Sequence, residues 1–374
     1  MNSSPIKQDF PICFVASARD YHAVDWYRAV KRICPNRRVF FATDSVESEG
    51  AQRLIEDSDE IFYLFPLDKY LFSKQSTLGD LWRNLVKMLA LPLSAYRLHK
   101  LGKRDDIIFH AHSMYYIFLC WLSRVKFIGT PMGSDVLVRP DHSFFYRLGT
   151  IFSLRAADVI TVDSVSLQMK IMALTGKGSD LVQNGIDTKS ASSARQSGLK
   201  RDLFVSVRGM YPNYRISELL EARNNSKSQI AIEFLYPFYE EGYLKSVRSH
   251  FIPGDREVGR LCKKEMFSLL GQACAVFSLP ISDSSPRSVY EAVFCGAAVI
   301  VTYGKWIECL PDCMKDRIIV VDLRDKDWFE IAIKKAKQIS WTPFKPSHEA
   351  FLAFDEAESM KQVCEKYYGE FING

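Results

Sequence analysis

The segment that decides the fold reads Ser278-Leu-Pro-Ile-Ser-Asp-Ser-Ser-Pro-Arg-Ser-Val-Tyr-Glu-Ala-Val-Phe-Cys-Gly296. An apolar run at residues 275–279 leads into a loop rich in Ser, Asp and Pro, and a helical pattern begins near residues 286–287. Ser284 or Ser285 would cap this helix, because a hydroxyl at that position accepts a hydrogen bond from a first-turn N–H group. The segment therefore predicts a strand, a polar loop and a helix, which form part of a βαβ unit.

The same alternation of short apolar runs and helical patterns extends through the rest of the chain. The candidate strands are residues 11–16, 38–42, 60–64, 106–110, 125–129, 159–162, 203–207, 230–235, 275–279, 297–302 and 318–321. Helical patterns separate them, for example at residues 78–89, 217–223, 263–273, 288–295 and 328–339. Such alternation is typical of a mostly parallel sheet covered by helices, so we expect an α/β fold.

One stretch interrupts the pattern and divides the chain. Residues 189–198 are small and polar and offer nothing to bury, so we expect an interdomain linker at residues 189–200. This predicts an N-terminal domain at residues 1–188 and a C-terminal domain at residues 201–340. A C-terminal helical segment, residues 341–374, would pack back on the N-terminal domain. Because open parallel sheets bind ligands beyond the carboxyl ends of their strands, functional residues should follow strands in both domains.

Composition excludes several classes of protein. Of 374 residues, 47% are hydrophobic and 25% charged, which excludes a largely disordered chain. The net charge of +5 is too small to indicate a nucleic-acid partner by itself. The nine Cys show no repeated metal-binding pair, which favours reduced thiols in a cytoplasmic protein and no metal site. We see no signal peptide, and the longest apolar run, residues 114–122, is far below the about 20 residues that span a bilayer.

The acidic residues of the first-quoted segment carry a family resemblance. Asp283, seven intervening residues, Glu291-Ala and then Cys295-Gly resemble the nucleotide-sugar site of GT-B glycosyltransferases, particularly the retaining family 4 of bacterial surface polysaccharide type. The resemblance implies two Rossmann-like doubly wound domains facing across a cleft. It also implies that Glu291 holds the donor ribose and that Asp283 lies near the donor sugar. The family usually has Glu where this chain has Asp283, followed by Gly where it has Ser284.

From the residues alone, two readings of this segment remain open. The unpaired N–H groups of the first helical turn suit a phosphate, which makes Ser285 a candidate donor-binding residue. Alternatively, the segment is a capped strand-helix unit with Glu291 on a solvated face.

A second match concerns the start of the C-terminal domain. Phe204-Val-Ser-Val-Arg208-Gly resembles the strand and loop where the family places an Arg, and then a Lys about five residues on, against the donor diphosphate. Arg208 takes the position of the Arg. The Lys is absent, and Arg215 is the substitute cation, since Arg grips phosphate through two N–H groups. The alternative for Arg208 is a surface cation after a strand. Taken together, the segments that resemble the family lie between about residues 106 and 310.

In the N-terminal half, Ile107-Ile-Phe-His-Ala-His112 ends a strand with two His. The family commonly has such a pair, with a His facing the cleft near the donor sugar and the acceptor, so His112 is a candidate catalytic residue. His110 is either a second cleft residue or a structural one. Gly133-Ser-Asp135 resembles a loop of polysaccharide-building members. Asp135, the third catalytic candidate with His112 and Asp283, either contacts an acceptor hydroxyl or closes a turn.

A basic segment between residues 69 and 104 bears on location. Its cations are Lys69, Lys74, Arg83, Lys87, Arg97, Lys100, Lys103 and Arg104, with Leu71, Phe72, Trp82, Leu85 and Leu89 between them. Basic charge with aromatic and Leu side chains is how a protein surface holds anionic lipid, which predicts peripheral contact with the inner face of the cell membrane. The alternative is an amphipathic helix on the sheet with a solvated basic edge.

The resemblance implies transfer of a hexosyl group, with retention, from a UDP- or GDP-type sugar to a saccharide or lipid-linked acceptor. Departure of the diphosphate creates negative charge, which Arg208, Arg215 and the helix terminus would stabilise without a metal or other cofactor. Two other functions remain open. A nucleotide-sugar 2-epimerase of the same fold would need no acceptor, and a non-catalytic scaffold subunit would keep the fold without the chemistry.

Overall fold

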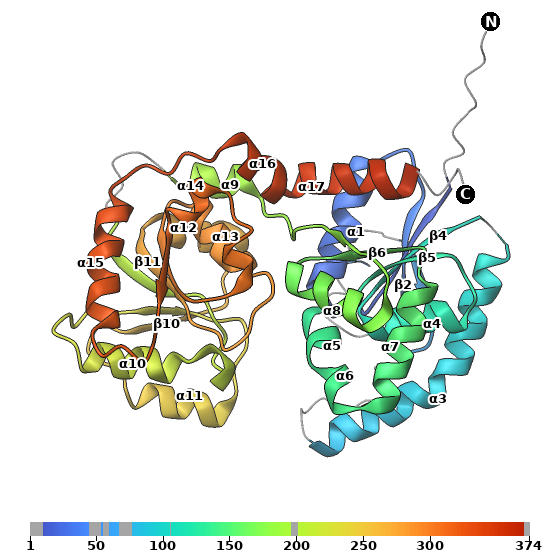
Figure 1. The fold of residues 1–374 in the computed structure, drawn as a ribbon, viewed down its shortest axis with the longest axis horizontal. Coiled ribbons are helices and arrows are strands. Elements are labelled where there is room, and N and C mark those ends of the chain that lie inside the picture. Colours follow the sequence, from blue (N-terminus) through green and yellow to red (C-terminus); the bar gives the residue numbers. More distant parts are fainter. Residues whose placement is uncertain are drawn as a thin grey trace, which may run out of the picture. The chain divides into compact units, whose positions relative to one another are not determined.

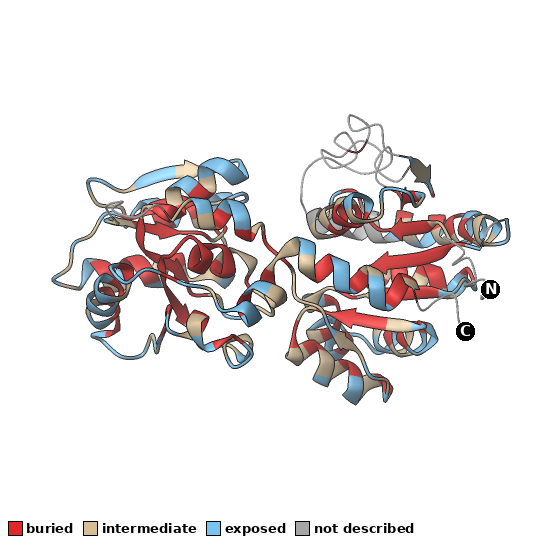
Figure 2. Ribbon diagram, turned by 90° about the horizontal axis from the view of Figure 1, so that it is seen from above, coloured by how far each residue is buried: buried red, intermediate tan, exposed pale blue. Residues whose placement is uncertain are grey.

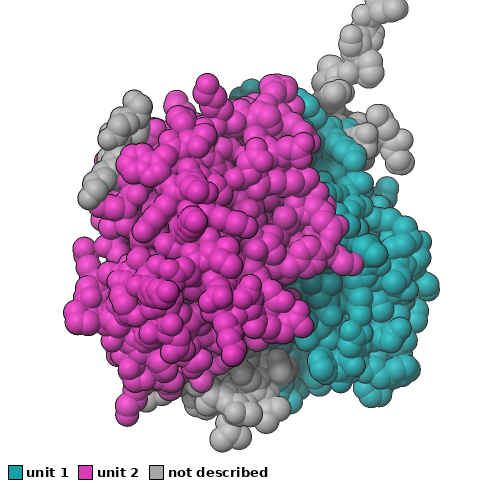
Figure 3. Space-filling model, turned by 60° about the vertical axis from the view of Figure 1, so that its left-hand side comes forward, with its two compact units in different colours: residues 1–183, 359–374 teal, residues 184–358 magenta. Residues whose placement is uncertain are grey.

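The computed structural model describes residues 10–44, 54, 60–66, 77–104, 106–195 and 201–369. The chain divides into two compact units (Figures 1 and 3). Unit 1 comprises Met1–Gln183 and Ser359–Gly374, and unit 2 comprises Asn184–Glu358.

In the described part of unit 1, seven parallel strands form one sheet in the order β3-β2-β1-β4-β5-β6-β7. The strands are β1 (Ile12–Val15), β2 (Val39–Thr43), β3 (Ile61–Tyr63), β4 (Ile108–His112), β5 (Phe127–Thr130), β6 (Val159–Val162) and β7 (Asp180–Leu181). The central strands β1, β2 and β4 are buried along their whole length (Figure 2). This explains why they read as continuous apolar runs, since helices cover both faces of a parallel sheet.

Two groups of helices cover this sheet. They are α1 (Tyr21–Ile33), α3 (Thr77–Gly102), α4 (Met114–Leu122), α5 (Gly133–Leu137), α6 (Arg139–His142), α7 (Phe144–Ala156), α8 (Val165–Thr175), α17 (Glu356–Val363) and the π-helix η4 (Cys364–Tyr368). Alternate residues of β1 point to opposite faces: Cys13 and Val15 pack with α3, α4, α7 and α8, whereas Ile12 and Phe14 pack with α1 and the C-terminal helices. The chain end thus completes the core of unit 1.

Among the described residues of unit 2, six parallel strands form a sheet in the order β10-β9-β8-β11-β12-β13. They are β8 (Leu203–Ser206), β9 (Glu233–Leu235), β10 (Arg256–Gly259), β11 (Ala273–Ser278), β12 (Ala298–Thr302) and β13 (Ile318–Val321). The helices are α9 (Thr188–Ser193), η2 (Pro212–Tyr214), α10 (Ile216–Asn224), α11 (Glu241–Arg248), α12 (Lys263–Gly271), α13 (Arg287–Phe294), η3 (Lys305–Ile307), α14 (Asp312–Lys315), α15 (Trp328–Ser340) and α16 (His348–Phe354).

Both sheets follow the doubly wound order, in which the chain starts in the middle of the sheet, moves to one edge and then returns past its start. The switch points lie between β1 and β4 in unit 1, and between β8 and β11 in unit 2. The predicted fold class, α/β with two Rossmann-like doubly wound sheets, is confirmed. The sequence analysis missed β7, which has two residues, and β10, whose Arg-Glu-Val-Gly sequence lacks an apolar run.

The segment expected to be a linker is partly helical. Asp187 caps α9 by accepting a hydrogen bond from the Ser190 N–H at 2.9 Å, and Ala191 is buried in the core of unit 2. A run of small residues can therefore pack against a neighbouring helix, in this case α12 and α13. Residues 196–200 lie outside the described residues. The C-terminal segment also divides, with residues up to Glu358 in unit 2 and the rest in unit 1.

Candidate functional site

The polar site of unit 2 lies at its switch point. β8 ends at Ser206 and leads to Arg208, and β11 ends at Ser278 and leads to the loop that carries Asp283. The Arg208 Nη2 atom lies 2.7 Å from Asp283 Oδ2, and Arg208 Nε donates a hydrogen bond to Ser278 Oγ at 2.7 Å. The two charged side chains remain 11% and 18% exposed. Arg208 is therefore not a freely solvated surface cation, because an acid and a hydroxyl fix it at the end of the sheet.

Neighbouring loops hold this ion pair from two sides. The Arg208 guanidinium lies over the Tyr214 ring, 5.6 Å from its centre, which adds a cation–π contact. The backbone of Ile281 donates to the carbonyl of Asn213 at 2.8 Å, so the loop after β8 is joined to the loop after β11. Burial raises the pKa of Tyr214, which keeps its ring neutral beside the cation.

A cavity of about 160 Å³ opens beside the pair. Arg208 and Asp283 line it together with Thr302, Tyr303 and Trp306 from the end of β12. A water molecule takes about 30 Å³ in the liquid, so this volume suits a phosphate-sized group better than a whole nucleotide. The site thus presents one guanidinium and one carboxylate to a small polar ligand.

Helix α13 begins differently from the prediction. Pro286 occupies its cap position and has no side-chain acceptor for a first-turn N–H group, so the prediction of a Ser284 or Ser285 cap is wrong. Instead, the Ser285 N–H donates to Asp283 Oδ1 at 3.3 Å. This bond closes a short turn between Asp283 and Ser285. A contact between the Ser285 hydroxyl and the donor nucleotide stays a prediction.

Glu291 lies on α13 and is buried, with 5% of its surface exposed. Its Oε1 atom lies 3.7 Å from Arg287 Nε, and Arg287 also pairs with Glu356 at 3.4 Å. The alternative of a solvated face is therefore wrong for Glu291. Neither Glu291 nor Arg287 is among the residues that line the cavity, so their predicted contact with a donor ribose stays a prediction.

Arg215 takes the cap position of α10 with a left-handed backbone, φ 52°. This conformation is uncommon for a residue other than glycine, and it marks the sharp turn between η2 and α10. The side chain is half-buried and does not line the cavity. A contact with the diphosphate, predicted where the family has Lys, stays a prediction.

In unit 1, His110 and His112 lie side by side at the end of β4. His110 is fully buried, and its two ring nitrogens contact the Tyr368 hydroxyl and Thr130 Oγ1, each at 2.7 Å. Burial and the neighbouring His112 hold the pKa of His110 well below its usual range. With both nitrogens engaged inside the protein, His110 is a structural residue, which decides between the two alternatives for this side chain.

His112 differs from His110 in having an unused ring nitrogen. Its Nε2 atom is enclosed and has no hydrogen-bond partner among the described residues. Burial, with a smaller effect of His22, lowers the pKa of His112 to about 3, so the ring is neutral at physiological pH. The next residue, Ser113, has φ 68°, a strained conformation that is enriched at functional sites. A neutral imidazole with a spare nitrogen can accept or donate one hydrogen bond.

Asp135 is buried in the short helix α5, and its carboxylate contacts the start of another helix rather than closing a turn of its own loop. Its Oδ2 atom accepts a hydrogen bond from the backbone N–H of Met114 at 3.0 Å, and Oδ1 pairs with Arg139 Nη1 at 3.0 Å. The carboxylate thereby stabilises the N-terminus of α4, where N–H groups lack helical partners. Contact with an acceptor hydroxyl stays a prediction.

The sequence analysis missed two other side chains at this edge. Asp44 directly follows β2, and the Tyr116 hydroxyl donates a hydrogen bond to its Oδ1 atom. Burial and the Asp44 carboxylate raise the pKa of Tyr116, so the phenol keeps its proton. The position of an Asp directly after a buried strand could have identified Asp44. No local signal indicates Tyr116, since its apolar neighbours make it read as core.

The basic segment forms much of helix α3. Lys69, Lys74, Leu71 and Phe72 lie outside the described residues, as does the side chain of Arg83. Trp82, Leu85 and Leu89 are 41%, 45% and 73% exposed, so the apolar stripe of the sequence faces outward rather than packing on the sheet. Of the described helices, none is long and apolar enough to cross a membrane. Within the same residues no three His, Cys, Asp or Glu side chains gather as metal ligands, and none of the nine Cys forms a disulfide.

Comparison with solved structures identifies the class of fold. HepE from Anabaena, in complex with UDP and glucose, superposes with a TM-score of 0.69 at 14% identity, over 95% of this chain and 98% of HepE. Sucrose-phosphate synthase from Thermosynechococcus elongatus gives a TM-score of 0.72 at 13% identity, over 98% of this chain and 100% of the synthase. A glycosyltransferase from Rickettsia africae gives 0.71 at 11% identity, with 98% and 100% covered.

These likenesses establish that the chain has the GT-B fold, shared with glycosyltransferases. In sequence comparisons, no family model matches the chain, and no curated protein matches it.

Proposed function

We propose that this protein is a glycosyltransferase that moves a hexosyl group from a nucleotide-diphosphate sugar to a saccharide or lipid-linked acceptor. The observation that carries the proposal is the Arg208–Asp283 pair beside a phosphate-sized cavity, at the switch point of unit 2. A doubly wound sheet binds nucleotides at this point. HepE, which has the same fold as this chain, is bound to UDP-glucose in one of its structures.

The donor would be a UDP or GDP sugar whose diphosphate lies against Arg208. When the bond between the sugar and the diphosphate breaks, negative charge develops on the leaving group, and a fixed guanidinium stabilises it. Arg215 and the first turn of α13 would add to this field, with Ser285 donating a hydrogen bond and Glu291 accepting from the ribose. No metal is required in this mechanism, because cations and N–H groups of the protein supply the positive charge.

The acceptor would bind in unit 1. The neutral His112, with its unpartnered Nε2 atom, can hydrogen-bond a sugar hydroxyl, and Asp135 is the nearby carboxylate predicted to contact the acceptor. In unit 2, Asp283 would contact the donor sugar. We further propose that the reaction retains the configuration of the sugar and serves synthesis of a surface polysaccharide, in line with the family resemblance of the Asp283–Glu291 segment.

Calorimetry tests the donor site most directly. UDP, GDP and the corresponding nucleosides are titrated into the parent protein and into Arg208→Ala. Loss of charge-assisted hydrogen bonds costs about 1.5–3 kcal/mol, so the variant should bind the diphosphates roughly 10- to 100-fold more weakly and the nucleosides about as well as the parent. Equal weakening of both ligands would show that Arg208 acts through the structure of the site.

The same proteins distinguish the alternative functions. A parent protein that binds neither UDP nor GDP would support a non-catalytic scaffold. Conversion of a UDP-sugar without any acceptor, with no release of UDP, would support a 2-epimerase. Release of UDP that depends on an added saccharide or lipid extract is the result expected for a transferase.

We also propose a cytoplasmic location with peripheral contact to anionic membrane. Lys100, Lys103 and Arg104, at the end of α3 and directly after it, are exposed beside the outward-facing apolar stripe. Each cation near an anionic bilayer contributes about 1 kcal/mol. Changing all three to Ser should therefore reduce cosedimentation with vesicles that contain phosphatidylglycerol, and salt should weaken binding by the parent.

The matched control changes three exposed Lys of α15 in unit 2, namely Lys334, Lys335 and Lys337, to Ser. This variant removes the same charge and should cosediment like the parent. Equal loss in both triple variants would attribute binding to net charge, and a parent that ignores anionic vesicles at low salt would contradict the membrane contact.

A further inference from the structure

A groove of about 750 Å³ lies in unit 1 between α3, α4 and the α6–α7 region. Its walls are largely apolar and include Met88 and Leu91 of α3, Phe118 of α4 and Phe145 of α7. Grooves of roughly 300–1,000 Å³ enclose most of a small organic ligand. The volume is therefore sufficient for a hydrocarbon chain, whereas the cavity at Arg208 is sized for a phosphate.

The groove opens onto an exposed apolar surface. At its rim Met88 and Phe145 are 69% and 84% exposed, and the neighbouring Leu89 and Phe144 are exposed to a similar extent. Contiguous apolar surface of this kind marks a binding site on a soluble domain, because its exposure to water is unfavourable. The ligand that covers it should be apolar along most of its length.

Two cationic side chains, Lys87 and Arg139, line the groove. Lys87 Nζ lies 4.6 Å from the centre of the Tyr115 ring, and Arg139, which pairs with Asp135, lies over the ring of Tyr146. All four of these cationic and aromatic residues line the groove, and none of its described lining residues is acidic. The charge therefore favours a ligand with an anionic group at one end.

Two enclosed hydroxyl groups lie at the same place. The hydroxyl oxygen of Tyr115 is enclosed and makes no hydrogen bond within the described part of the chain. The enclosed hydroxyl of Tyr146 interacts with the Arg139 guanidinium, which leaves the hydroxyl proton unused. Buried hydroxyls normally have a partner, so each is a candidate donor to a ligand oxygen. The charged end also adjoins the predicted acceptor site, since Met114, which lines the groove, donates its N–H to Asp135 and follows His112 by two residues.

We propose that this groove binds the hydrocarbon chain of a lipid phosphate, with the phosphate at Lys87 and Arg139. The inference rests on the proposed function and deepens it, because the lipid phosphate would be the anchor of the acceptor. The chain lies along Met88, Phe118 and Phe145, and the anionic end points toward the carboxyl edge of the sheet. A guanidinium has five N–H donors, so Arg139 can bind a phosphate while it remains paired with Asp135.

Gly149 provides a variant that fills the groove. It lies on α7 among the lining residues, and a Cβ atom added there would meet the Phe118 ring at 3.5 Å, an ordinary contact distance. Gly149→Leu should therefore fold and occupy the space of the hydrocarbon chain without altering the exposed surface. Phe145→Asp is a second variant, at a side chain too exposed to matter for folding. Met169→Glu, exposed on α8 of the same unit, is the matched control.

The experiment measures binding of farnesyl phosphate, farnesol and inorganic phosphate by calorimetry below the concentration at which micelles form. The parent should bind farnesyl phosphate at least tenfold more tightly than farnesol, and inorganic phosphate should not displace farnesyl phosphate. Gly149→Leu and Phe145→Asp should each lose at least tenfold in affinity for farnesyl phosphate, and Met169→Glu should bind like the parent. Lys87→Met should reduce the preference for farnesyl phosphate over farnesol.

Four results would overturn the inference. They are undiminished binding in a normally folded Gly149→Leu, equal affinity for farnesol and farnesyl phosphate, binding of vesicles but never of the single lipid, and a dimer in sedimentation that Phe145→Asp abolishes. UDP binding by the same preparations separates this inference from the proposed function. Loss of lipid binding with normal UDP affinity would contradict only the proposed lipid site. Absence of UDP binding would contradict the proposed transferase function.

Discussion

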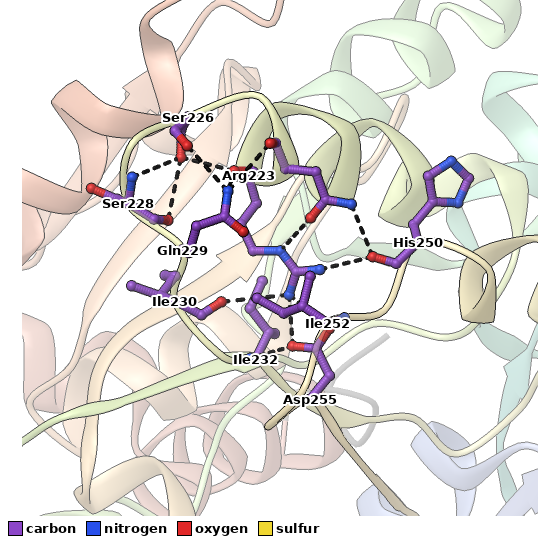
Figure 4. Close-up of polar contacts among 10 residues, drawn as sticks. Arg223, Ser226, Ser228, Gln229, Ile230, Ile232, His250, Ile252 and Asp255 are labelled. Carbon is purple, nitrogen blue, oxygen red and sulfur yellow. Dashed lines mark hydrogen bonds and ion pairs between the residues drawn. The ribbon is translucent and has the colours of Figure 1, made fainter.

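Two Arg–Asp pairs in unit 2 share the same chemistry and differ in their surroundings. Arg223 Nη1 lies 2.6 and 2.7 Å from the two carboxylate oxygens of Asp255, and both side chains are completely buried (Figure 4). Arg223 Nη2 also donates to the carbonyl of His250 at 2.9 Å, while Asp255 accepts the N–H groups of Ile232 and Ile252. Protein atoms surround the pair on every side.

The pair between Arg208 and Asp283 has fewer partners. Besides Asp283, the guanidinium contacts the Ser278 hydroxyl and the ring of Tyr214, and a cavity lies on its open side. The Arg223 pair joins α10 to the turn before β10, so its role is to hold elements together. The Arg208 pair leaves donor capacity at the mouth of a cavity, which is the arrangement that a ligand can complete.

The largest expected effect concerns the enclosed pair. Arg223→Met leaves the Asp255 carboxylate buried without its cation, and breaking a buried ion pair in this way costs about 3–5 kcal/mol. Urea denaturation, followed by circular dichroism, measures the change in the free energy of unfolding. A loss of less than about 1 kcal/mol would remove the distinction between the two pairs.

The second effect extends the comparison to the enclosed His residues of unit 1. Because the pKa of His112 is lowered to about 3 in the folded protein, only the unfolded chain takes up its proton as the pH falls below about 6.5. The contribution of His112 to the free energy of unfolding should therefore be fully present above pH 6.5 and decrease toward pH 3. By pH 5 about 2 kcal/mol of this contribution should be lost. His110, whose pKa is also lowered, adds a loss in the same direction.

The measurement is the free energy of unfolding at pH 7.5 and pH 5. His112→Gln should reduce the difference between the two pH values by about 2 kcal/mol. An unchanged pH dependence in His112→Gln would mean that His112 is protonated in the folded protein at pH 5.

The third effect is a small change in stability with a large change in binding. Arg208→Ala removes the cation from an Asp283 carboxylate that is mostly buried but keeps some contact with water. The free energy of unfolding should therefore fall by about 1–2 kcal/mol, between the values for an exposed and a fully buried pair, and less than in Arg223→Met. The same variant should lose the nucleoside diphosphate affinity described above. Unfolding as severe as that of Arg223→Met would assign Arg208 a structural role instead.

The smallest effect is expected at a surface pair. Arg248 Nε lies 2.9 Å from Glu257 Oε2, but the Arg248 side chain is 53% exposed. Water and salt screen pairs at the surface, so Arg248→Ala should lower the free energy of unfolding the least of the three Arg variants, and less still in high salt. A loss comparable to that of Arg223→Met would show that the burial of these three ion pairs does not determine how much each contributes to the free energy of unfolding.

The amino-acid sequence by itself determined the class of fold and the position of the site along the chain. Alternating apolar runs and helical patterns identified the central strands of both sheets, because burial on two faces leaves a continuous apolar run. The rule that ligands bind after strands filtered the candidates, and the family resemblance assigned Arg208, Asp283 and His112 as candidate site residues. β10 and α9 were missed because their residues carry no local apolar signal, and tertiary packing alone places them.

Only the tertiary structure decided what each polar residue does. His110 and its partner Tyr368 are 258 residues apart, and Arg208 and Ser278 are 70 apart, so no local pattern relates them. Periodicity records whether a residue lies on an apolar face, but whether that face turns inward depends on what packs against it. For this reason the stripe of α3 that reads as core lies on the surface. Partner identity depends on strand order and register, which arise when the whole chain is folded.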